Sequence, residues 1–215
     1  LLKQKNVDTG MGVERTAAAL QGIKNVYETE LFIPILNKIK DLSKYYNEIS
    51  ARIVADHLKA ATFILGDNKN IEPSNVEQGY VLRRLIRKSI RHGNILGINK
   101  NFTKEIAEEI IKIYKNDYSE LEKNKEFIFK QLDAEENRFK LTLEKGLKIF
   151  SQLEGNSISG NDAFLLYQSY GFPIELTVEL AKENNMEVDV EGFNDEFTRH
   201  QETSRIGAEK KFKSG

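Results

Sequence analysis

The sequence has no cysteine among its 215 residues and only three histidines, His57, His92 and His200. Without cysteine, the chain can form neither a disulfide scaffold nor a thiolate metal site, and it cannot use cysteine catalysis. The histidines lie far apart and show none of the paired spacing that zinc ligands have, so we expect no metal site.

Long hydrophobic runs are also missing. No stretch approaches the ~20 apolar residues that a membrane-spanning helix needs, and no signal-peptide pattern is present. The chain opens on Leu1 rather than Met, so we expect it to be a piece of a longer protein. Its length suits one sizeable domain, or one domain and part of another.

Charge is plentiful and unevenly distributed. Charged residues make up 30% of the chain and hydrophobic residues 40%, which favours long, ion-paired, exposed helices over disorder. Residues 1–100 hold 16 Lys and Arg against 10 Asp and Glu, whereas residues 101–215 hold 16 against 23. This asymmetry indicates a polyanionic partner for the first half, although chance scatter also explains it.

Hydrophobic periodicity predicts a mainly α chain. The expected helices cover residues 13–21, 31–42, 50–65, 78–91, 103–115, 118–153, 161–169, 173–184 and 191–211. Residues 1–12 are typical of the end of a strand that enters a glycine turn, and we expect no other strand. Ser74 and Glu77 have the spacing of a capping box, which would let the helix predicted at 78–91 begin before Gln78.

The helix predicted at 78–91 carries a basic face. Arg84, Arg87, Lys88 and Arg91 recur at i, i+3, i+4 and i+7, and no Asp or Glu interrupts residues 78–104. A solvated face is the plain interpretation, but concentrated positive charge is better explained by phosphate contacts. Four such contacts predict about a 50-fold loss of affinity between ~50 and ~200 mM salt.

The glycine turn near the N-terminus is a second candidate site. Gly10 and Gly12 let a backbone approach a ligand closely, and Arg15 follows on the first turn of a helix. A guanidinium there suits a phosphate or a purine ring, and Asp8 suits an ammonium group. On composition alone the pattern is common, so the residues do not decide the ligand.

Five segments in this order resemble alanyl-tRNA synthetases. They are residues 7–15 (VDTGMGVER), similar to class II motif 3, then 55–60, 73–75, 79–93 and 167–176. The resemblance covers essentially the whole chain. It implies the end of a class II catalytic domain at 1–25, followed by a helical domain at 26–215 that recognises the tRNA acceptor stem.

The resemblance also implies roles for individual residues. Gly10, Gly12 and Arg15 would contact ATP, which the parent enzyme uses with Mg2+, and Asp8 would bind the α-amino group of alanine. Asn75 would read the G:U wobble pair of alanine tRNA. The remaining tRNA contacts implied are Arg83, Arg84, Arg87, Lys88, Arg91 and Gln168.

Position 168 departs from the family, which has aspartate there. Gln168 is neutral and longer than aspartate, and it forfeits a charge-assisted hydrogen bond. We therefore expect weaker discrimination against a G:C-containing stem, and an increase in that discrimination in Gln168→Asp.

The activity expected is that of a cytoplasmic alanine–tRNA ligase, with no membrane or DNA partner. Motifs 1 and 2 and the zinc-binding editing domain do not occur in the sequence, so we expect neither adenylate formation nor editing, and no tightly bound cofactor. The alternative is a stand-alone helical RNA-binding module without catalysis. A pure interaction bundle is a third possibility, and it would show no salt-sensitive RNA binding.

Overall fold

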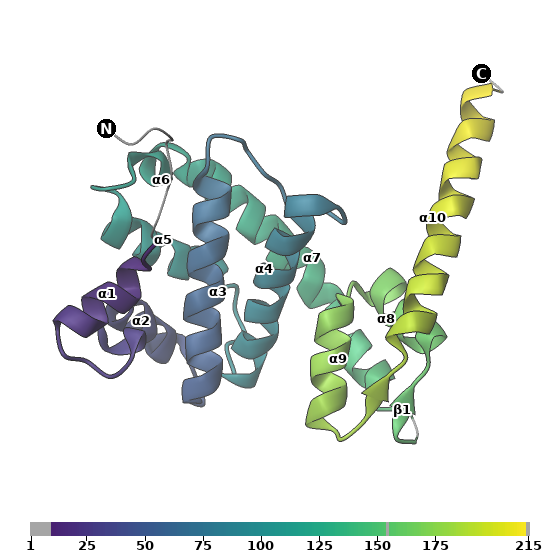
Figure 1. Ribbon diagram of the computed structural model, residues 1–215, viewed down its shortest axis with the longest axis horizontal. Helices are drawn as coiled ribbons and strands as arrows, with labels where there is room; N and C mark the ends of the chain where they lie inside the picture. Colours follow the sequence, from purple (N-terminus) through teal and green to yellow (C-terminus); the bar gives the residue numbers. More distant parts are fainter. Residues whose placement is uncertain (1–9, 154, 214–215) are drawn as a thin grey trace, which may run out of the picture. The chain divides into compact units, whose positions relative to one another are not determined.

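The computed structural model describes residues 10–153 and 155–213, and the chain divides into two compact units, Leu1–Glu136 and Asn137–Gly215 (Figure 1). The first unit contains α1 (Val13–Leu20), the 3-10 helix η1 (Val26–Glu28), α2 (Ile33–Leu42), α3 (Glu48–Gly66), α4 (Glu77–Ile95), α5 (Thr103–Tyr114) and α6 (Ser119–Lys123). The second contains β1 (Ser157–Ile158), α8 (Gly160–Tyr170), α9 (Ile174–Glu183), β2 (Glu187–Val188) and α10 (Val190–Lys213), and α7 (Lys125–Phe150) contributes to both. The mainly α class is confirmed. The strand expected before the glycine turn falls on residues 1–9, outside the described part.

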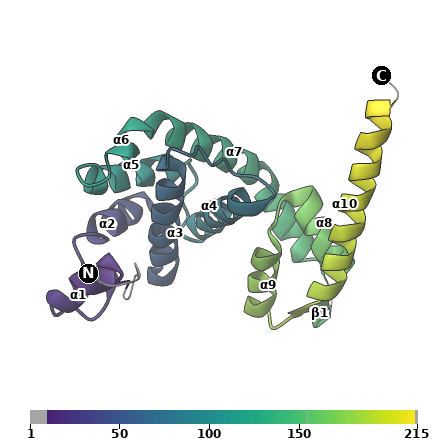
Figure 2. The ribbon, with the colours of Figure 1, turned by 45° about the horizontal axis from the view of Figure 1, so that its top comes forward.

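Helix α3 is central to the first unit. Its residues Val54, Leu58, Ala61 and Leu65 are fully buried, at the i, i+4, i+7 and i+11 spacing of one helical face. Helix α4 packs along it, and α2, α5 and α6 also contact α3 (Figure 2). Burial of each large aliphatic side chain contributes about 1.5–3 kcal/mol, so this buried face stabilises the unit.

Helix ends follow local rules where the sequence supplies a cap. The Asn47 side chain accepts a hydrogen bond from the Ser50 N–H at 2.8 Å and so begins α3. Pro34 lies in the first turn of α2, where its missing N–H has no helical partner to lose. Gly22, after α1, has a φ of +67°, in the left-handed region that favours glycine.

The single long helix predicted at 118–153 is wrong. The chain forms α6 and α7 instead, with Asn124 between them at φ −98° and ψ 13°. The Asn124 amide donates to the Gly66 carbonyl at 2.7 Å and to Asn68 Oδ1 at 3.3 Å. This contact with the end of α3 stabilises the break between α6 and α7. The apolar periodicity of the sequence continues across the break, so the pattern did not reveal it.

The start of α5 is capped by a carboxylate from another helix. Phe102, at the N-cap position, has no side-chain cap of its own. Glu136 of α7, fully buried, accepts from the Phe102 N–H at 3.1 and 3.2 Å. It also accepts from the Thr103 N–H at 3.0 Å and from the Thr103 hydroxyl at 2.6 Å. A helix N-terminus favours negative charge, so this contact ties α5 to α7.

The second unit has a small sheet that periodicity did not predict. β1 pairs with β2 in parallel, with Ser157 opposite Glu187 and Ile158 opposite Val188. Strands of two residues carry no alternation to detect. The prediction that the chain has no strand beyond its start is therefore wrong.

Aromatic side chains hold α8 and α10 of this unit together. Phe164 and Tyr167 of α8 lie 6.1 and 5.6 Å, between ring centroids, from Phe193 of α10. The Ser159 side chain caps α8, and Gly171 ends it at a φ of +69°. This packing fixes the helix that carries Gln168.

Candidate nucleic-acid interface

The loop that precedes α4 lies directly against that helix. The Ser74 N–H donates to the Gly79 carbonyl at 3.0 Å. A Cβ atom at position 79 would lie 2.2 Å from Ser74 Oγ and 2.5 Å from the Glu72 carbonyl oxygen. Only glycine at position 79 lets the loop lie this close to α4. This close contact fixes the position of the loop and of Asn75 within it.

The capping box considered for Ser74 and Glu77 does not form. Helix α4 begins at Glu77, and Val76 occupies the N-cap position without a side-chain cap. The Ser74 hydroxyl donates instead to the Val76 carbonyl at 3.0 Å. Ser74 thus stabilises the loop rather than the helix terminus.

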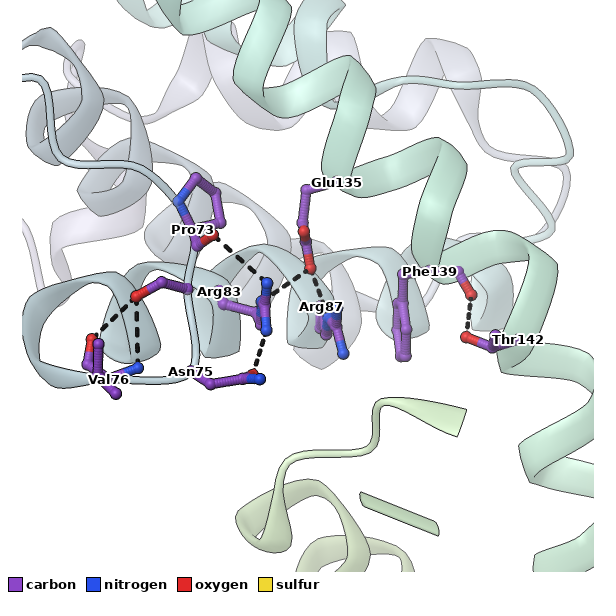
Figure 3. A network of polar contacts seen from close by, with 9 residues as sticks. Pro73, Asn75, Val76, Arg83, Arg87, Glu135, Phe139 and Thr142 are labelled. Atoms are coloured by element: carbon purple, nitrogen blue, oxygen red, sulfur yellow. Dashed lines mark hydrogen bonds and ion pairs between the residues drawn. The ribbon is translucent and has the colours of Figure 1, made fainter. Parts of the chain in front are cut away.

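Arg83 fixes the orientation of Asn75. Its guanidinium donates to Asn75 Oδ1 and, at 3.4 Å, to the Pro73 carbonyl (Figure 3). Its Nε also lies 3.5 Å from Glu135 Oε1. Asn75 is exposed. Because a carbonyl oxygen has two lone pairs, Asn75 Oδ1 keeps the capacity to accept a second hydrogen bond from a ligand.

The basic face of α4 is partly buried. Arg87 and Arg91 are only 6% and 5% exposed, and Arg87 Nε donates to Glu135 Oε1 at 2.6 Å. No Asp or Glu occurs in residues 78–104, but Glu135 of α7 reaches this face. Arg84 and Lys88 are half-buried and lie nearer the surface.

The second predicted site lies on α1. Arg15 is exposed, and Gly10 and Gly12 are exposed just before it. Gly12 is the N-cap residue at φ −71° and ψ 125°, and a Cβ at Gly10 would meet nothing within 4 Å. Neither glycine is required by the described structure, and both leave space for a ligand. Asp8 lies outside the described residues.

An ion pair that the sequence did not indicate joins α1 to α3. Lys59 Nζ contacts Glu14 Oε1, with side-chain exposures of 14% and 30%. The hydrogen bond from Lys59 is the main cause that holds the pKa of Glu14 below its ordinary value. Glu14 and Lys59 lie in two of the segments that resemble the family, 7–15 and 55–60, but nothing in the sequence indicates that they pair, because they are 45 positions apart.

A cavity of about 600 Å³ lies beside this ion pair. Its lining comes from α1, α3, α5 and the segments next to them, and includes Asp56, Phe63, Tyr114 and Tyr118. Burial raises the pKa of Tyr114 above its ordinary value. The Tyr114 and Tyr118 rings both pack edge-on against Phe63, with centroid distances of 5.1 and 5.0 Å.

The remaining predicted tRNA contact is Gln168. It is exposed on α8 and therefore belongs to the second unit, whereas Asn75 belongs to the first.

Among the described side chains, no three His, Asp or Glu residues form a group that could hold a metal ion. No helix in the described ranges is both long and apolar enough to cross a membrane.

Comparison with known proteins places these features in a family. The family model described as tRNA synthetases class II (A) matches residues 1–214. The chain is 47% identical over 224 residues to an alanine–tRNA ligase of Borreliella afzelii (strain PKo), and 48% identical over 227 residues to that of Treponema pallidum (strain Nichols). It is 44% identical over 217 residues to that of Prochlorococcus marinus (strain MIT 9301). The chain spans 38% of the length of the first two relatives and 24% of the third. The chain therefore belongs to the class II tRNA synthetases, in the group that this family model describes.

Proposed function

We propose that this chain is part of an alanine–tRNA ligase, which activates alanine with ATP and transfers it to alanine tRNA. The relatives named above are alanine–tRNA ligases, which supports this reaction. The observation that supports RNA binding is the exposed amide of Asn75 in the loop before α4. Arg83, a residue of α4, holds this amide in one orientation. Residues 1–25 end the catalytic domain in this proposal, and residues 26–215 recognise the acceptor stem. Cytoplasmic location stays a prediction.

In the catalytic part, we assign Arg15, Gly10 and Gly12 to ATP and Asp8 to the α-amino group of alanine. An exposed guanidinium on the first helical turn is suited to a phosphate oxygen or a purine face, and the open space at Gly10 admits a ligand. A carboxylate such as Asp8 complements an ammonium group. These residues bind and orient the reactants, which is most of what attack on a phosphate requires from a protein.

Membership in this family implies ATP-dependent catalysis, and Mg2+ normally accompanies the phosphates of ATP. The described side chains include no group of three His, Asp or Glu that would form a resident ion site. The part of the reaction assigned to this chain is the binding of ATP and alanine.

In the RNA-binding part, Asn75 would accept a hydrogen bond from the guanine amino group that a G:U pair presents in the shallow minor groove. Arg83 positions Asn75, because its guanidinium holds both the amide and the adjacent backbone. Arg84 and Lys88 would contact phosphates. Gln168 would be a second acceptor from α8.

Arg87 and Arg91 have a different place in this proposal from the one that the basic face suggested. Both are buried, and Arg87 is hydrogen-bonded to Glu135. We assign them to the support of α4 against its neighbours. Phosphate contacts in the first unit then fall from four to two.

The test compares two RNA hairpins that reproduce the acceptor stem of alanine tRNA, one with the G:U pair and one with G:C. Asn75→Ala is expected to reduce the preference for G:U by about 3- to 10-fold, since a single hydrogen bond contributes about 0.5–1.5 kcal/mol. Asn37→Ala, at an exposed asparagine of α2, is the matched control and keeps the preference. An unchanged preference in Asn75→Ala would remove Asn75 from the recognition site.

Salt dependence tests the number of phosphate contacts. Two contacts predict about a 7-fold loss of affinity between ~50 and ~200 mM salt, against about 50-fold for four. Filter binding at these two concentrations distinguishes the values. Affinity that ignores salt would contradict RNA binding by α4 and favour an interaction bundle.

Catalysis is tested in the full-length parent. We expect it to exchange pyrophosphate into ATP when alanine is present, and the 215-residue chain alone to be inactive. A parent that binds RNA but forms no adenylate would favour the RNA-binding module without catalysis.

A further inference from the structure

Helix α1 has little hydrophobic attachment to the rest of the first unit. Ala18 is its one buried residue, whereas Val13 and Leu20 are 61% and 84% exposed. Its C-terminal end is followed by a hydrogen bond from Gln21 to Glu30 at 2.7 Å. Apolar burial therefore does little to set the rotation of α1 about its own axis.

Lys59 supplies a polar contact at the other end of α1. Its ammonium contacts the Glu14 carboxylate and lies 5.2 Å from the centroids of both the Phe32 and the Tyr114 rings. The Lys59 side chain is 14% exposed, so solvent screens this ion pair less than one on the surface. Aromatic faces also attract an ammonium group. The charge of Lys59 is thus fixed where α1, α3 and α5 approach one another.

Glu14 and Arg15 are neighbours on the first turn of α1. Successive helical side chains point about 100° apart, so the direction of one determines the direction of the other. With Glu14 turned toward Lys59, Arg15 projects to solvent, where it is exposed. A rotation of α1 that released Glu14 would also turn Arg15 away.

We propose that Lys59 is a positioning residue for Arg15: by holding Glu14 against α3, it fixes the rotation of α1 at which Arg15 meets ATP. This inference rests on the ATP role proposed for Arg15. It also links α3, which packs along the RNA-binding helix α4, to the helix that carries the ATP contact. Lys59 itself does not touch ATP in this proposal.

The decisive variant is Lys59→Met in the full-length parent, because methionine keeps an unbranched stem and removes the charge. We expect the KM for ATP in pyrophosphate exchange to rise roughly tenfold, as a small displacement of a binding group can cause. The KM for alanine should change less than twofold. Lys59→Arg, which retains the charge, should recover most of the affinity for ATP.

Lys38→Met is the matched control. Lys38 Nζ pairs with Glu105 Oε2 at 2.9 Å and so joins α2 to α5. This variant should leave the KM for ATP unchanged, even if the Tm falls. An equal rise in both lysine variants would mean a general loss of structure and would overturn the proposal.

Hydrogen exchange of the full-length parent supplies a second measurement. Lys59→Met should speed exchange at the end of α1, such as at the Gln21 N–H that donates to the Ala17 carbonyl, and leave α4 protected. Faster exchange with an unchanged KM for ATP would also overturn the proposal.

The variant Arg15→Ala separates the ATP role of Arg15 from the positioning role of Lys59. If it does not raise the KM for ATP, the ATP role of Arg15 fails. If it does and Lys59→Met does not, only the positioning role fails.

Discussion

Replacement of Glu136 by alanine should strongly destabilise the first unit. The carboxylate of this fully buried residue accepts hydrogen bonds from three donors at the start of α5: the Phe102 N–H, the Thr103 N–H and the Thr103 hydroxyl. Each buried donor left without an acceptor costs about 1–3 kcal/mol, which sets an upper limit near 9 kcal/mol. Removal of the carboxylate also removes the desolvation cost of a buried charge, and water can enter the space that it leaves. Both effects offset part of this cost. We therefore expect a loss of about 3–5 kcal/mol.

A graded series makes the origin of the loss visible. Glu136→Gln keeps one acceptor oxygen but turns an NH2 group toward the same donors, so we expect about 1.5–3 kcal/mol. Glu126→Ala, at an exposed glutamate of the same helix within the first unit, should change stability by about 0.5 kcal/mol or less. The expected order of destabilisation is Glu136→Ala, then Glu136→Gln, then Glu126→Ala.

Urea unfolding followed by circular dichroism measures this order, and hydrogen exchange locates it. Amide protection should fall first in the opening turn of α5, around Ile106. A Glu136→Ala variant as stable as Glu126→Ala would refute the reasoning, because the buried donors would then have found equivalent acceptors. A Gln variant less stable than the Ala variant would refute the assignment of the effect to lost acceptors.

Two further predictions concern the loop before α4 and the response to acid. Gly79→Ala would place a methyl carbon 2.5 Å from the Glu72 carbonyl oxygen. We therefore expect a lower Tm and a weaker preference for the G:U hairpin. An unchanged preference would contradict the role given to this loop. The pKa of Glu105 lies below its ordinary value of 4.5 because Lys100, and then Lys38, donate to its carboxylate. Its contribution is present above pH 4.5 and is lost as pH falls through the folded-state pKa, so Glu105→Gln should make Tm less sensitive to acid between about pH 5 and 3. A parallel loss of Tm in wild type and variant would contradict it.

Local signals predicted the helices well. In the helix predicted at 50–65, Val54, Leu58 and Leu65 have helical spacing, and together they form the buried face at the centre of the first unit. The glycine after α1 and the proline in the first turn of α2 also coincide with helix ends, because each acts through its own backbone. Such features depend on a few adjacent residues, which the sequence displays directly.

The features that periodicity missed depend on distant partners. The break at Asn124 is held by Gly66, 58 positions away, and Arg87 is buried by Glu135, 48 positions away. A helical wheel shows which residues share a face but not which other helix will cover it. For the same reason nothing in the sequence indicates that Lys59 contacts Glu14. The roles assigned to Asp8, Arg15, Asn75 and Gln168 came from family resemblance and stay predictions.

The adjacent carboxylates of α7 limit how this helix can change in length. Glu135 reaches Arg87 on α4, while Glu136, one position on, reaches the start of α5. An insertion or deletion of one residue between Lys125 and Glu135 would turn both by about 100° and remove both contacts together. Changes in chain length are therefore expected to accumulate in surface loops such as 67–71, and to be selected against within this part of α7.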